Sequence, residues 1–333
     1  IRLLNESDTP SALCFSTNSR TEIVTKHCSD ESDGRMESKV KDGLMLTSVA
    51  LTKSDFRLGT QLQSSAIGRH WPEYLMEGAC LGLFMVSACT FTIVLQHPGS
   101  ALRQALPSSF ARRALTGLAM GLTAIALIYS PWGKQSGAHL NPSTTLTFLR
   151  LGKIEPWDAA FYFLAQIVGG TLGVVVSSLI WGTAITHEKV RYAATLPAMN
   201  GTAVAFIAEL AISFLMMTMV LNVSNSMRIS RFTGVLAGAL IATYITLESP
   251  LSGMSMNPAR SFASAFPGRI WQALWVYFTA PPLGMLLAGE LYVRTHGKSA
   301  VLCAKLHHDN DKRCIFRCAY KPFATQIAVK ETM

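Results

Sequence analysis

The sequence predicts an all-α membrane protein with six transmembrane helices and two re-entrant half-helices, arranged as an inverted three-plus-three repeat. Three observations lead to this fold class. Half of the 333 residues are apolar and only 15% are charged, and the mean hydropathy is +0.30. The apolar residues gather into runs of about 20, the length that crosses a bilayer core of roughly 30 Å. Two halves of the chain also repeat one pattern of residues in the same order.

Six apolar runs have spanning length, and two shorter stretches lie between them. The stretches around Asn141 and Asn257 are interrupted and too short to cross a bilayer, which favours re-entrant half-helices. The six predicted spans are 74–96, 114–130, 159–181, 202–223, 232–247 and 271–293.

The chain divides into a membrane domain and two polar ends. Residues 1–73 are rich in Ser and Thr and contain no apolar run, so we expect a disordered tail there. They lack a signal-peptide pattern and open with Ile1, so the first residue need not be the start of translation. Residues 74–293 form the membrane domain, with repeats over about 74–181 and 202–293. Residues 294–333 carry eight basic and three acidic residues, which predicts a basic tail, solvated or lying on an anionic leaflet.

The internal repeat sets the topology. Glu77 in the first span and Glu209 in the fourth are each followed by Ala, Leu and Met at the same offsets. Each half has three spans, an odd number, so the second half enters the membrane from the opposite side and the repeat is inverted. Lys and Arg are more frequent in the flanks on the side of the two tails. The positive-inside rule therefore places both tails in the cytoplasm, and we expect an integral multi-pass protein of the plasma membrane.

Each half carries one Asn-Pro motif, GAHLNPS from Gly137 and GMSMNPARS from Gly253. Asn is a preferred helix N-cap, and Pro suits the first helical position, so each motif predicts the start of a short helix. Because the halves are inverted, the two helix N-termini should meet near the membrane midplane, each with roughly half a positive charge. A cation would meet a barrier there.

The side chains of the motifs predict a pore. The amides of Asn141 and Asn257 can donate to the oxygen of a passing molecule and orient it, which breaks the donor chain that a proton needs. Arg260 adds a fixed cation toward one mouth, and a cation at this depth is expensive unless it serves a pore. Irregular backbone inside a membrane also requires a water-filled path or burial in protein.

Paired Asn-Pro motifs in an inverted repeat resemble the aquaporin, or major intrinsic protein, superfamily over residues 74–293. The resemblance implies a passive channel for water and small neutral solutes, not an enzyme, that forms a homotetramer in the lipid bilayer with one pore per subunit. We expect no cofactor, no metal and no nucleic-acid partner. By position, the pore motifs are Asn141, Pro142, Ser143, Asn257, Pro258 and Ala259, and the outer constriction is Met120, Ile245, Met254 and Arg260.

The sequence does not identify the solute, because one set of residues favours larger neutral solutes and another favours water. Ser143 replaces the alanine usual in the first motif, and Met120 and Ile245 replace an aromatic ring and a histidine, which favours glycerol, urea, ammonia, hydrogen peroxide or neutral metalloid acids beside water. Four other positions resemble those of water channels. They are Ser261, Ala265, Tyr277 and Phe278.

Glu77 and Glu209 are ionisable groups inside apolar spans, for which we prefer a structural role as acceptors for backbone N–H groups of the re-entrant loops. His139 is likewise expected to bond nearby backbone. Two alternatives stay open. One is a proton-coupled transporter or ion channel that uses both glutamates, and the other is a structural or junctional membrane protein.

The seven cysteines predict neither a zinc site nor a disulfide framework, because they show no paired CxxC and no His at finger spacing. Cys314 and Cys318 lie near His307 and His308 in the sequence, but their spacing matches no standard metal pattern.

Overall fold

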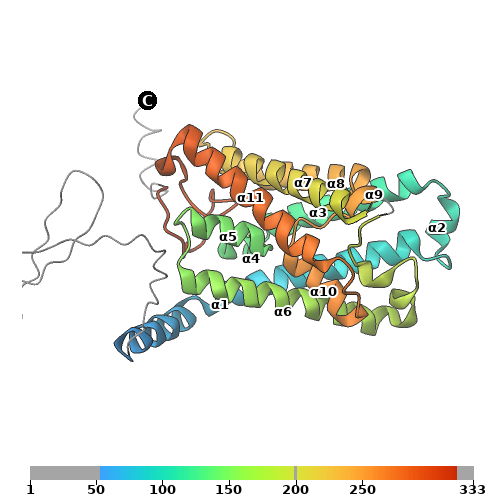
Figure 1. Cartoon of the computed structure of the whole chain (residues 1–333), viewed down its shortest axis with the longest axis horizontal. Helices are drawn as coiled ribbons and strands as arrows, with labels where there is room; N and C mark the ends of the chain where they lie inside the picture. Colours follow the sequence, from blue (N-terminus) through green and yellow to red (C-terminus); the bar gives the residue numbers. More distant parts are fainter. Residues whose placement is uncertain (1–52, 199–200, 321–333) are drawn as a thin grey trace, which may run out of the picture. The chain divides into compact units, whose positions relative to one another are not determined.

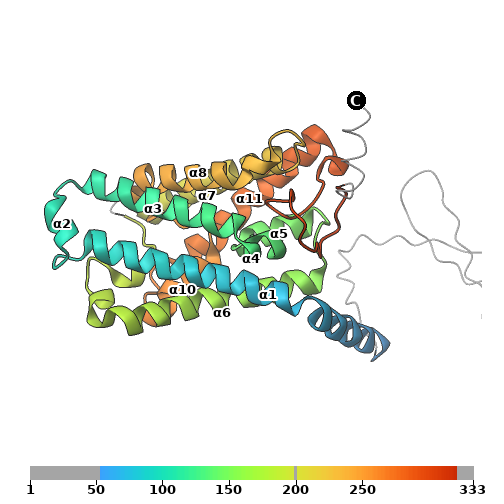
Figure 2. The same cartoon turned by 180° about the vertical axis from the view of Figure 1, so that it is seen from behind.

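Eleven α-helices and no strand occur in residues 53–198 and 201–320, which the computed structural model describes, with side chains from Ser65 onward. These residues belong to a unit that begins at Thr52. Six helices are long, and they run alongside one another in Figures 1 and 2. They are α1 (Lys53–Gln96), α3 (Ser109–Tyr129), α6 (Pro156–Trp181), α7 (Gly201–Ser224), α8 (Thr233–Leu247) and α11 (Leu274–His296).

All six predicted spans are therefore helical, and the two predicted half-helices are present as well. These are α5 and α10, of nine and eleven residues, which lie between the long helices. The half-helices are α5 (Pro142–Arg150) and α10 (Pro258–Gly268). The remaining three helices are short connections, α2 (Ala101–Ala105), α4 (Pro131–Ser136) and α9 (Ser249–Ser252).

Five of the described helical stretches are long and apolar enough to cross a membrane, and α11 is not among them. Its 23 residues have the required length, but Pro281, Pro282 and Glu290 dilute its apolar character. Helix α11 packs against α7 in the second half as α6 packs against α1 in the first. Its position as the sixth long helix is thus set by packing and not by hydropathy alone.

Glycines let the paired helices approach closely. A Cβ on Gly121 of α3 would lie 2.5 Å from the carbonyl oxygen of Gly238 in α8, and one on Gly238 would lie 2.6 Å from that of Gly121. A Cβ on Gly169 of α6 would lie 2.1 Å from the carbonyl oxygen of Gly78 in α1. Such distances exclude any side chain, so these small residues serve packing within one chain.

The boundaries of the polar ends differ from the prediction. Helix α1 begins at Lys53, so the part of the predicted tail from 53 to 73 is helical, whereas residues 1–52 lie outside the described residues. At the other end, α11 continues to His296. We call Gly297–Tyr320 the C-terminal segment. It folds against the helices, so this part of the predicted basic tail packs on protein.

The C-terminal segment contacts the helix ends through the backbone. The N–H of Leu302 donates to Asn225 Oδ1 at 2.6 Å, and the N–H of Arg317 donates to the carbonyl of Lys153 at 3.0 Å. These contacts place the segment at one end of the helices, here called the tail-side end. The opposite end, which carries α2, is called the far end.

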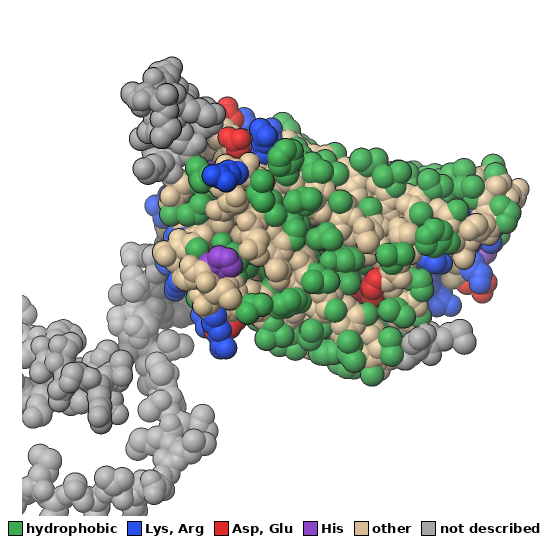
Figure 3. Space-filling view, turned by 90° about the horizontal axis from the view of Figure 1, so that it is seen from above, with side chains coloured by type: hydrophobic (Ala, Val, Ile, Leu, Met, Phe, Trp, Pro, Cys, Tyr) green, Lys and Arg blue, Asp and Glu red, His purple; other side chains and the backbone are tan. Residues whose placement is uncertain are grey.

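The outer surface is apolar along the helices. Leu164, Leu172 and Leu179 of α6 are exposed, as are Ile207 and Leu215 of α7. Figure 3 shows hydrophobic side chains across one face, with most charged groups near its two ends. A surface of this kind fits contact with lipid chains.

Candidate functional site

The two Asn-Pro motifs begin helices α5 and α10, as the sequence predicts. Asn141 caps α5, and its Oδ1 accepts from the N–H of Ser143 at 2.9 Å. Asn257 caps α10, and its Oδ1 accepts from the N–H of Arg260 at 3.1 Å. Each Pro fills the first helical position, where no donor is lost. The caps fix both amide side chains at the helix N-termini.

The two caps meet through reciprocal hydrogen bonds. Asn141 Nδ2 donates to the carbonyl of Met256 at 2.7 Å, and Asn257 Nδ2 donates to the carbonyl of Leu140 at 2.6 Å. Each asparagine thus bonds the residue that precedes the other one. This contact joins the N-termini of two helices that extend toward opposite ends of the molecule (Figure 1).

The loops that lead to the asparagines have an unusual backbone. Leu140 and Met256 have φ values of 51° and 55°, and Ala138 and Met254 both have 55°. Non-glycine residues rarely adopt this left-handed region. This conformation recurs before both asparagines, so the strained backbone is a matched feature of the two halves.

Two buried carboxylates hold these loops in place. Glu77 accepts from the N–H of Leu140, and from Ser136 Oγ at 2.8 Å. Glu209 accepts from the N–H of Met256 at 2.7 Å. It also accepts from the N–H of Ser255 at 2.6 Å and from the hydroxyl of Ser252 at 2.7 Å. Both glutamates are 0% exposed. Their oxygens accept hydrogen bonds from buried backbone N–H groups and hydroxyls of the loops, which would otherwise lack partners.

One cavity of about 330 Å³ extends along the helix axes between the two ends. At the far end its wall includes Gln96, Arg113 and Lys189, and at the tail-side end it includes Ile128 and Leu306. Seven of the predicted site residues are part of this wall. They are the asparagines Asn141 and Asn257, the predicted constriction residues Met120, Ile245, Met254 and Arg260, and the predicted loop support His139.

Arg260 lies in the first turn of α10, on the far-end side of the asparagines. Its Nη1 is buried and has no hydrogen-bond partner within the described residues. A buried donor without a partner is costly, and a solute oxygen in the cavity can satisfy it.

Several motif residues do not reach the wall. Ser143 and Ala259 are both 0% exposed and face protein instead. Pro142 and Pro258 start the half-helices, and Glu77 and Glu209 lie behind the loops. Among the water-channel-like positions, Tyr277 donates to the carbonyl of Ser252, so it supports the loop. None of these four positions is part of the cavity wall.

His139 bonds protein groups on both sides of its ring, as expected of a structural histidine. Nε2 lies 2.8 Å from the carbonyl oxygen of Ala304 and must be the protonated nitrogen, because that oxygen only accepts. Nδ1 lies 2.9 Å from Thr145 Oγ1. The ring stacks between Phe148 and Phe316, with centroids 5.2 Å and 5.3 Å away.

Two parts of the site were absent from the sequence prediction. Tyr162 donates to the carbonyl of Ser136 at 2.5 Å, the counterpart of the bond from Tyr277, and aligning the two repeats offers a signal for this pair. Leu306 of the C-terminal segment lines the tail-side end of the cavity, where its N–H donates to the carbonyl of Gly137 at 3.1 Å. No pattern in the sequence indicates that second contact.

The family model described as Major intrinsic protein matches residues 69–292. A protein described as Putative aquaporin NIP4-1 of Arabidopsis thaliana is 35% identical over 174 residues, which cover 52% of this chain and 59% of that protein. Aquaporin NIP1-4 of Oryza sativa subsp. japonica is 37% identical over 177 residues, covering 53% of this chain and 62% of that protein. The matches thus span about six tenths of these relatives' own length.

A solved structure shares the fold. It is described as the aquaglyceroporin from Plasmodium falciparum and has a TM-score of 0.57. The superposition covers 69% of this chain and 98% of that chain at 18% identity, so the likeness concerns the fold alone.

Proposed function

Because the chain belongs to the major intrinsic protein family, we propose that it is a passive transmembrane channel for water that excludes protons and ions. Small neutral solutes such as glycerol, urea, ammonia and hydrogen peroxide are further candidates. The proposal rests above all on the reciprocal contact of Asn141 and Asn257 in the wall of the cavity. The names of the relatives, which are aquaporins, point to the same class.

The chemistry of the asparagine pair supports passage of water without protons. Each amide uses one N–H in the reciprocal bond, which leaves a second N–H for the oxygen of a solute. Two such donors at one level hold a water molecule with its hydrogens directed along the pore. The N-termini of α5 and α10 add positive potential at the same place and oppose a migrating cation.

The far-end wall supports selection among neutral solutes. Met120, Ile245 and Met254 give it apolar surface, and Arg260 gives it a donor and a fixed positive charge. We assign these four residues to the selectivity filter. Apolar surface beside a single donor suits solutes with both carbon and hydroxyl groups, such as glycerol, as well as water.

The competing functions find less support. A proton-coupled carrier would need Glu77 or Glu209 to face the cavity, but both lie behind the loops with their oxygens bonded to loop groups. A purely junctional role leaves the reciprocal asparagine contact without a purpose. We therefore also propose that the protein performs no chemistry on its solute.

The proposal includes a homotetramer in the plasma membrane, with both tails in the cytoplasm. The excess of Lys and Arg in the flanks on the side of the tails supports this orientation. The broad apolar faces of α6 and α7 leave surface for neighbouring subunits as well as for lipid.

Reconstitution in liposomes tests the proposal. Light scattering after an osmotic step in sucrose, glycerol, urea or peroxide measures permeation, and a trapped pH dye measures proton leakage. We expect faster water permeation than in empty vesicles and no added proton leakage. Asn257→Asp, which introduces a carboxylate into the wall, should slow water, while Ser143→Ala in the same scaffold should not. Water permeation equal to that of empty vesicles would refute the channel, and rapid proton leakage would favour a transporter.

A further inference from the structure

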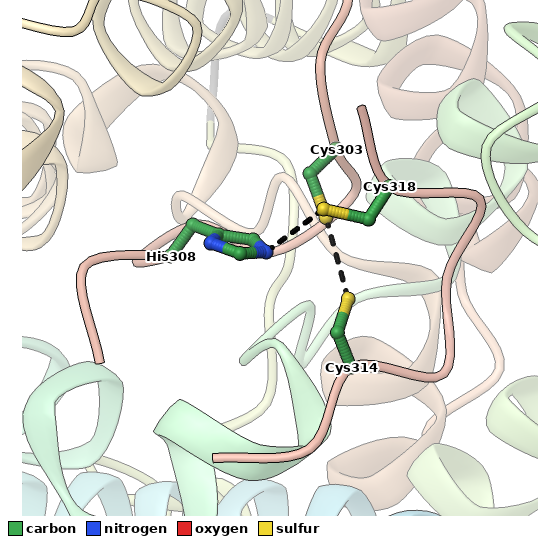
Figure 4. Close-up of side chains that lie close together, drawn as sticks. All are labelled: Cys303, His308, Cys314 and Cys318. Atoms are coloured by element: carbon green, nitrogen blue, oxygen red, sulfur yellow. Dashed lines mark hydrogen bonds between the residues drawn. The ribbon is translucent and has the colours of Figure 1, made fainter. Parts of the chain in front are cut away.

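Four metal-ligand side chains converge in the C-terminal segment, although the sequence spacing gives no zinc pattern. Cys303, His308, Cys314 and Cys318 each offer one ligand atom, and these four atoms all lie within 4.8 Å of one another. Figure 4 shows the four side chains directed toward a common point from successive turns of the segment. The intervals of four, five and three residues between them differ from those of zinc fingers.

The spacing of the atoms is close to that of a tetrahedral centre. Zn–S bonds of about 2.3 Å and Zn–N bonds of about 2.0–2.1 Å place two sulfurs about 3.8 Å apart and a sulfur and a nitrogen about 3.5 Å apart. Cys303 Sγ lies 3.6 Å from Cys314 Sγ, and Cys318 Sγ lies 3.0 Å from His308 Nε2. All three cysteines are free thiols. Because all four ligand atoms lie within 4.8 Å of one another, shifts of about 1 Å or less complete the tetrahedron.

A buried cation beside the cluster is a second, independent observation. The side chain of Lys305 is 2% exposed, and its Nζ donates to the carbonyls of Lys312 at 3.1 Å and Arg313 at 2.7 Å. No salt bridge to Lys305 occurs in the described part of the chain. A metal centre with three thiolates and one imidazole carries a net charge of −1, which would balance this ammonium group.

We infer that Cys303, His308, Cys314 and Cys318 form a structural site for a soft divalent cation of the zinc class. On binding, the three thiols release their protons to solvent, and His308 supplies the lone pair of its neutral ring. Three sulfurs and one imidazole select zinc over magnesium or calcium, which prefer oxygen ligands. Four protein ligands close the coordination sphere, which is typical of a structural site.

The site is placed to fix the tail-side mouth of the cavity. Ala304 and Leu306, which bond His139 and Gly137 of the first re-entrant loop, lie between the ligands Cys303 and His308. A metal bound to both ligands would therefore hold Leu306 against the cavity wall. Any effect on permeation rests on the proposed channel function, whereas metal binding does not.

Cobalt substitution of the purified full chain provides the test. The reduced protein is stripped of metal with a chelator and then titrated with Co²⁺ and Zn²⁺. We expect one ion per chain, absorption typical of tetrahedral cobalt with thiolate charge transfer, and displacement by zinc. Hydrogen–deuterium exchange should slow in the C-terminal segment on zinc binding and stay unchanged in α3. These measurements need no variant and no transport assay.

Neighbouring histidines supply a matched pair of variants. His308→Ala removes a ligand and should weaken zinc binding by at least about 100-fold. Loss of a residue that only hydrogen-bonds to a metal ligand already lowers metal affinity by about 10–100-fold, and loss of the ligand itself should cost at least as much. His307→Ala removes a ring that packs edge-on against Tyr129 with centroids 4.9 Å apart, and it should keep full binding. Cys318→Ser should behave as His308→Ala.

The inference is overturned if the reduced wild-type chain shows no tetrahedral cobalt spectrum. It is equally overturned if His307→Ala and His308→Ala bind zinc alike, or if the thiols pair in a disulfide in preference to binding zinc. If zinc slows hydrogen–deuterium exchange in the C-terminal segment but does not change permeation, the metal site is supported and has no effect on the proposed channel.

Discussion

The two re-entrant loops share one scaffold and differ at the mouths they face. In each, a buried glutamate accepts from the N–H that precedes the asparagine, and the amide crosses to the other loop. Each loop also has a polar pair two residues before and four residues after its asparagine. In the first loop, His139 Nδ1 lies 2.9 Å from Thr145 Oγ1, and in the second, Ser255 Oγ lies 2.6 Å from Ser261 Oγ.

The difference lies in what continues from that pair. The larger ring of His139 reaches beyond its loop to the carbonyl of Ala304, so the first loop is joined to the C-terminal segment. Ser255 bonds within its own loop and half-helix, and the second pair continues through Ser261 to Thr195 Oγ1 at 2.7 Å, in the connection between α6 and α7. Three positions after the asparagine, the first loop has Thr144, whereas the second has Arg260 with a free donor.

The comparison shows that the two halves of an inverted repeat can keep the same contacts at the centre of the cavity while the residues toward its two ends differ. The shared contacts involve the backbone and the carboxylates, which tolerate little change. The divergent side chains take no part in the shared contacts, so their chemistry is free to vary. The following predictions test both parts of this statement.

Removal of a loop anchor should have the largest effect. Glu209→Ala leaves the hydroxyl of Ser252 and the N–H groups of Ser255 and Met256 without their acceptor. A buried unpaired donor costs about 1–3 kcal/mol, so we expect at least about 3 kcal/mol of destabilisation. Thermal unfolding in detergent, followed by tryptophan fluorescence, measures the loss.

Glu188→Ala is the matched control for that anchor, because Glu188 is exposed and its ion pair within the described residues is with Lys189 at 3.7 Å. This variant should have the same melting temperature as the wild type. Equal melting temperatures for Glu209→Ala and Glu188→Ala would show that the carboxylate does not hold the loop.

Loss of the histidine that distinguishes the first loop should cost less. His139→Ala removes the contacts to Thr145 and Ala304 and the stacking on Phe148 and Phe316, for about 2 kcal/mol in total. Hydrogen exchange in the C-terminal segment should accelerate. Ser255→Ala, its counterpart in the second loop, should leave that exchange unchanged, and acceleration in both variants would contradict the difference between the loops.

Arg260→Ala should lower the barrier to cations at the far end. Removal of one fixed charge changes the energy of a cation a few ångström away by about 1–4 kcal/mol, so proton leakage into liposomes should rise about tenfold or more. A trapped pH dye measures the rate. Arg113→Ala, at the same end of the cavity wall, is the control and should leak less. Equal leakage would place the barrier elsewhere.

The double variant Met120→Phe with Ile245→His tests the width of the far-end wall. Larger and more polar groups should reduce glycerol permeation severalfold and water permeation less, because glycerol needs more space. Osmotic light scattering in glycerol and sucrose gradients compares the two rates. A parallel decrease of both would show that these residues do not select the solute.

Ser143→Ala should have the smallest effect. Ser143 Oγ is buried without a hydrogen-bond partner in the described residues and is not part of the cavity wall. Its loss should change stability by no more than about 0.5 kcal/mol and leave permeation of every solute unchanged. A change in the ratio of glycerol to water permeation would mean that this hydroxyl influences selection despite its distance from the wall.

Much of the fold follows from local patterns. The length of the apolar runs identifies the spans, and Asn followed by Pro identifies the starts of α5 and α10. The matched offsets after Glu77 and Glu209 reveal the repeat and hence the inversion. The structure confirms these features, and all four residues predicted for the outer constriction occur in the cavity wall.

The errors concern segments whose position depends on partners. Hydropathy ends the predicted membrane domain at residue 293, but the chain continues as an ordered segment because Arg317 bonds Glu155 at 2.6 Å and Arg313 bonds Glu73 at 2.5 Å. A basic tail looks the same in sequence whether its cations meet solvent or acidic side chains of the helices.

The sequence by itself determined the helical membrane fold, the inversion and the paired asparagines, because each depends on residues close together in the chain. Only the tertiary structure decided which motif residues reach the cavity, that Leu306 lies at one mouth, and that Cys303, His308, Cys314 and Cys318 converge. The physical reason is that helix length and capping are set by local backbone geometry and burial. The convergence of the four ligands depends on where the C-terminal segment, which has no periodic pattern, folds back onto the helices. That position is set by long-range contacts of the segment with acidic side chains and backbone carbonyls.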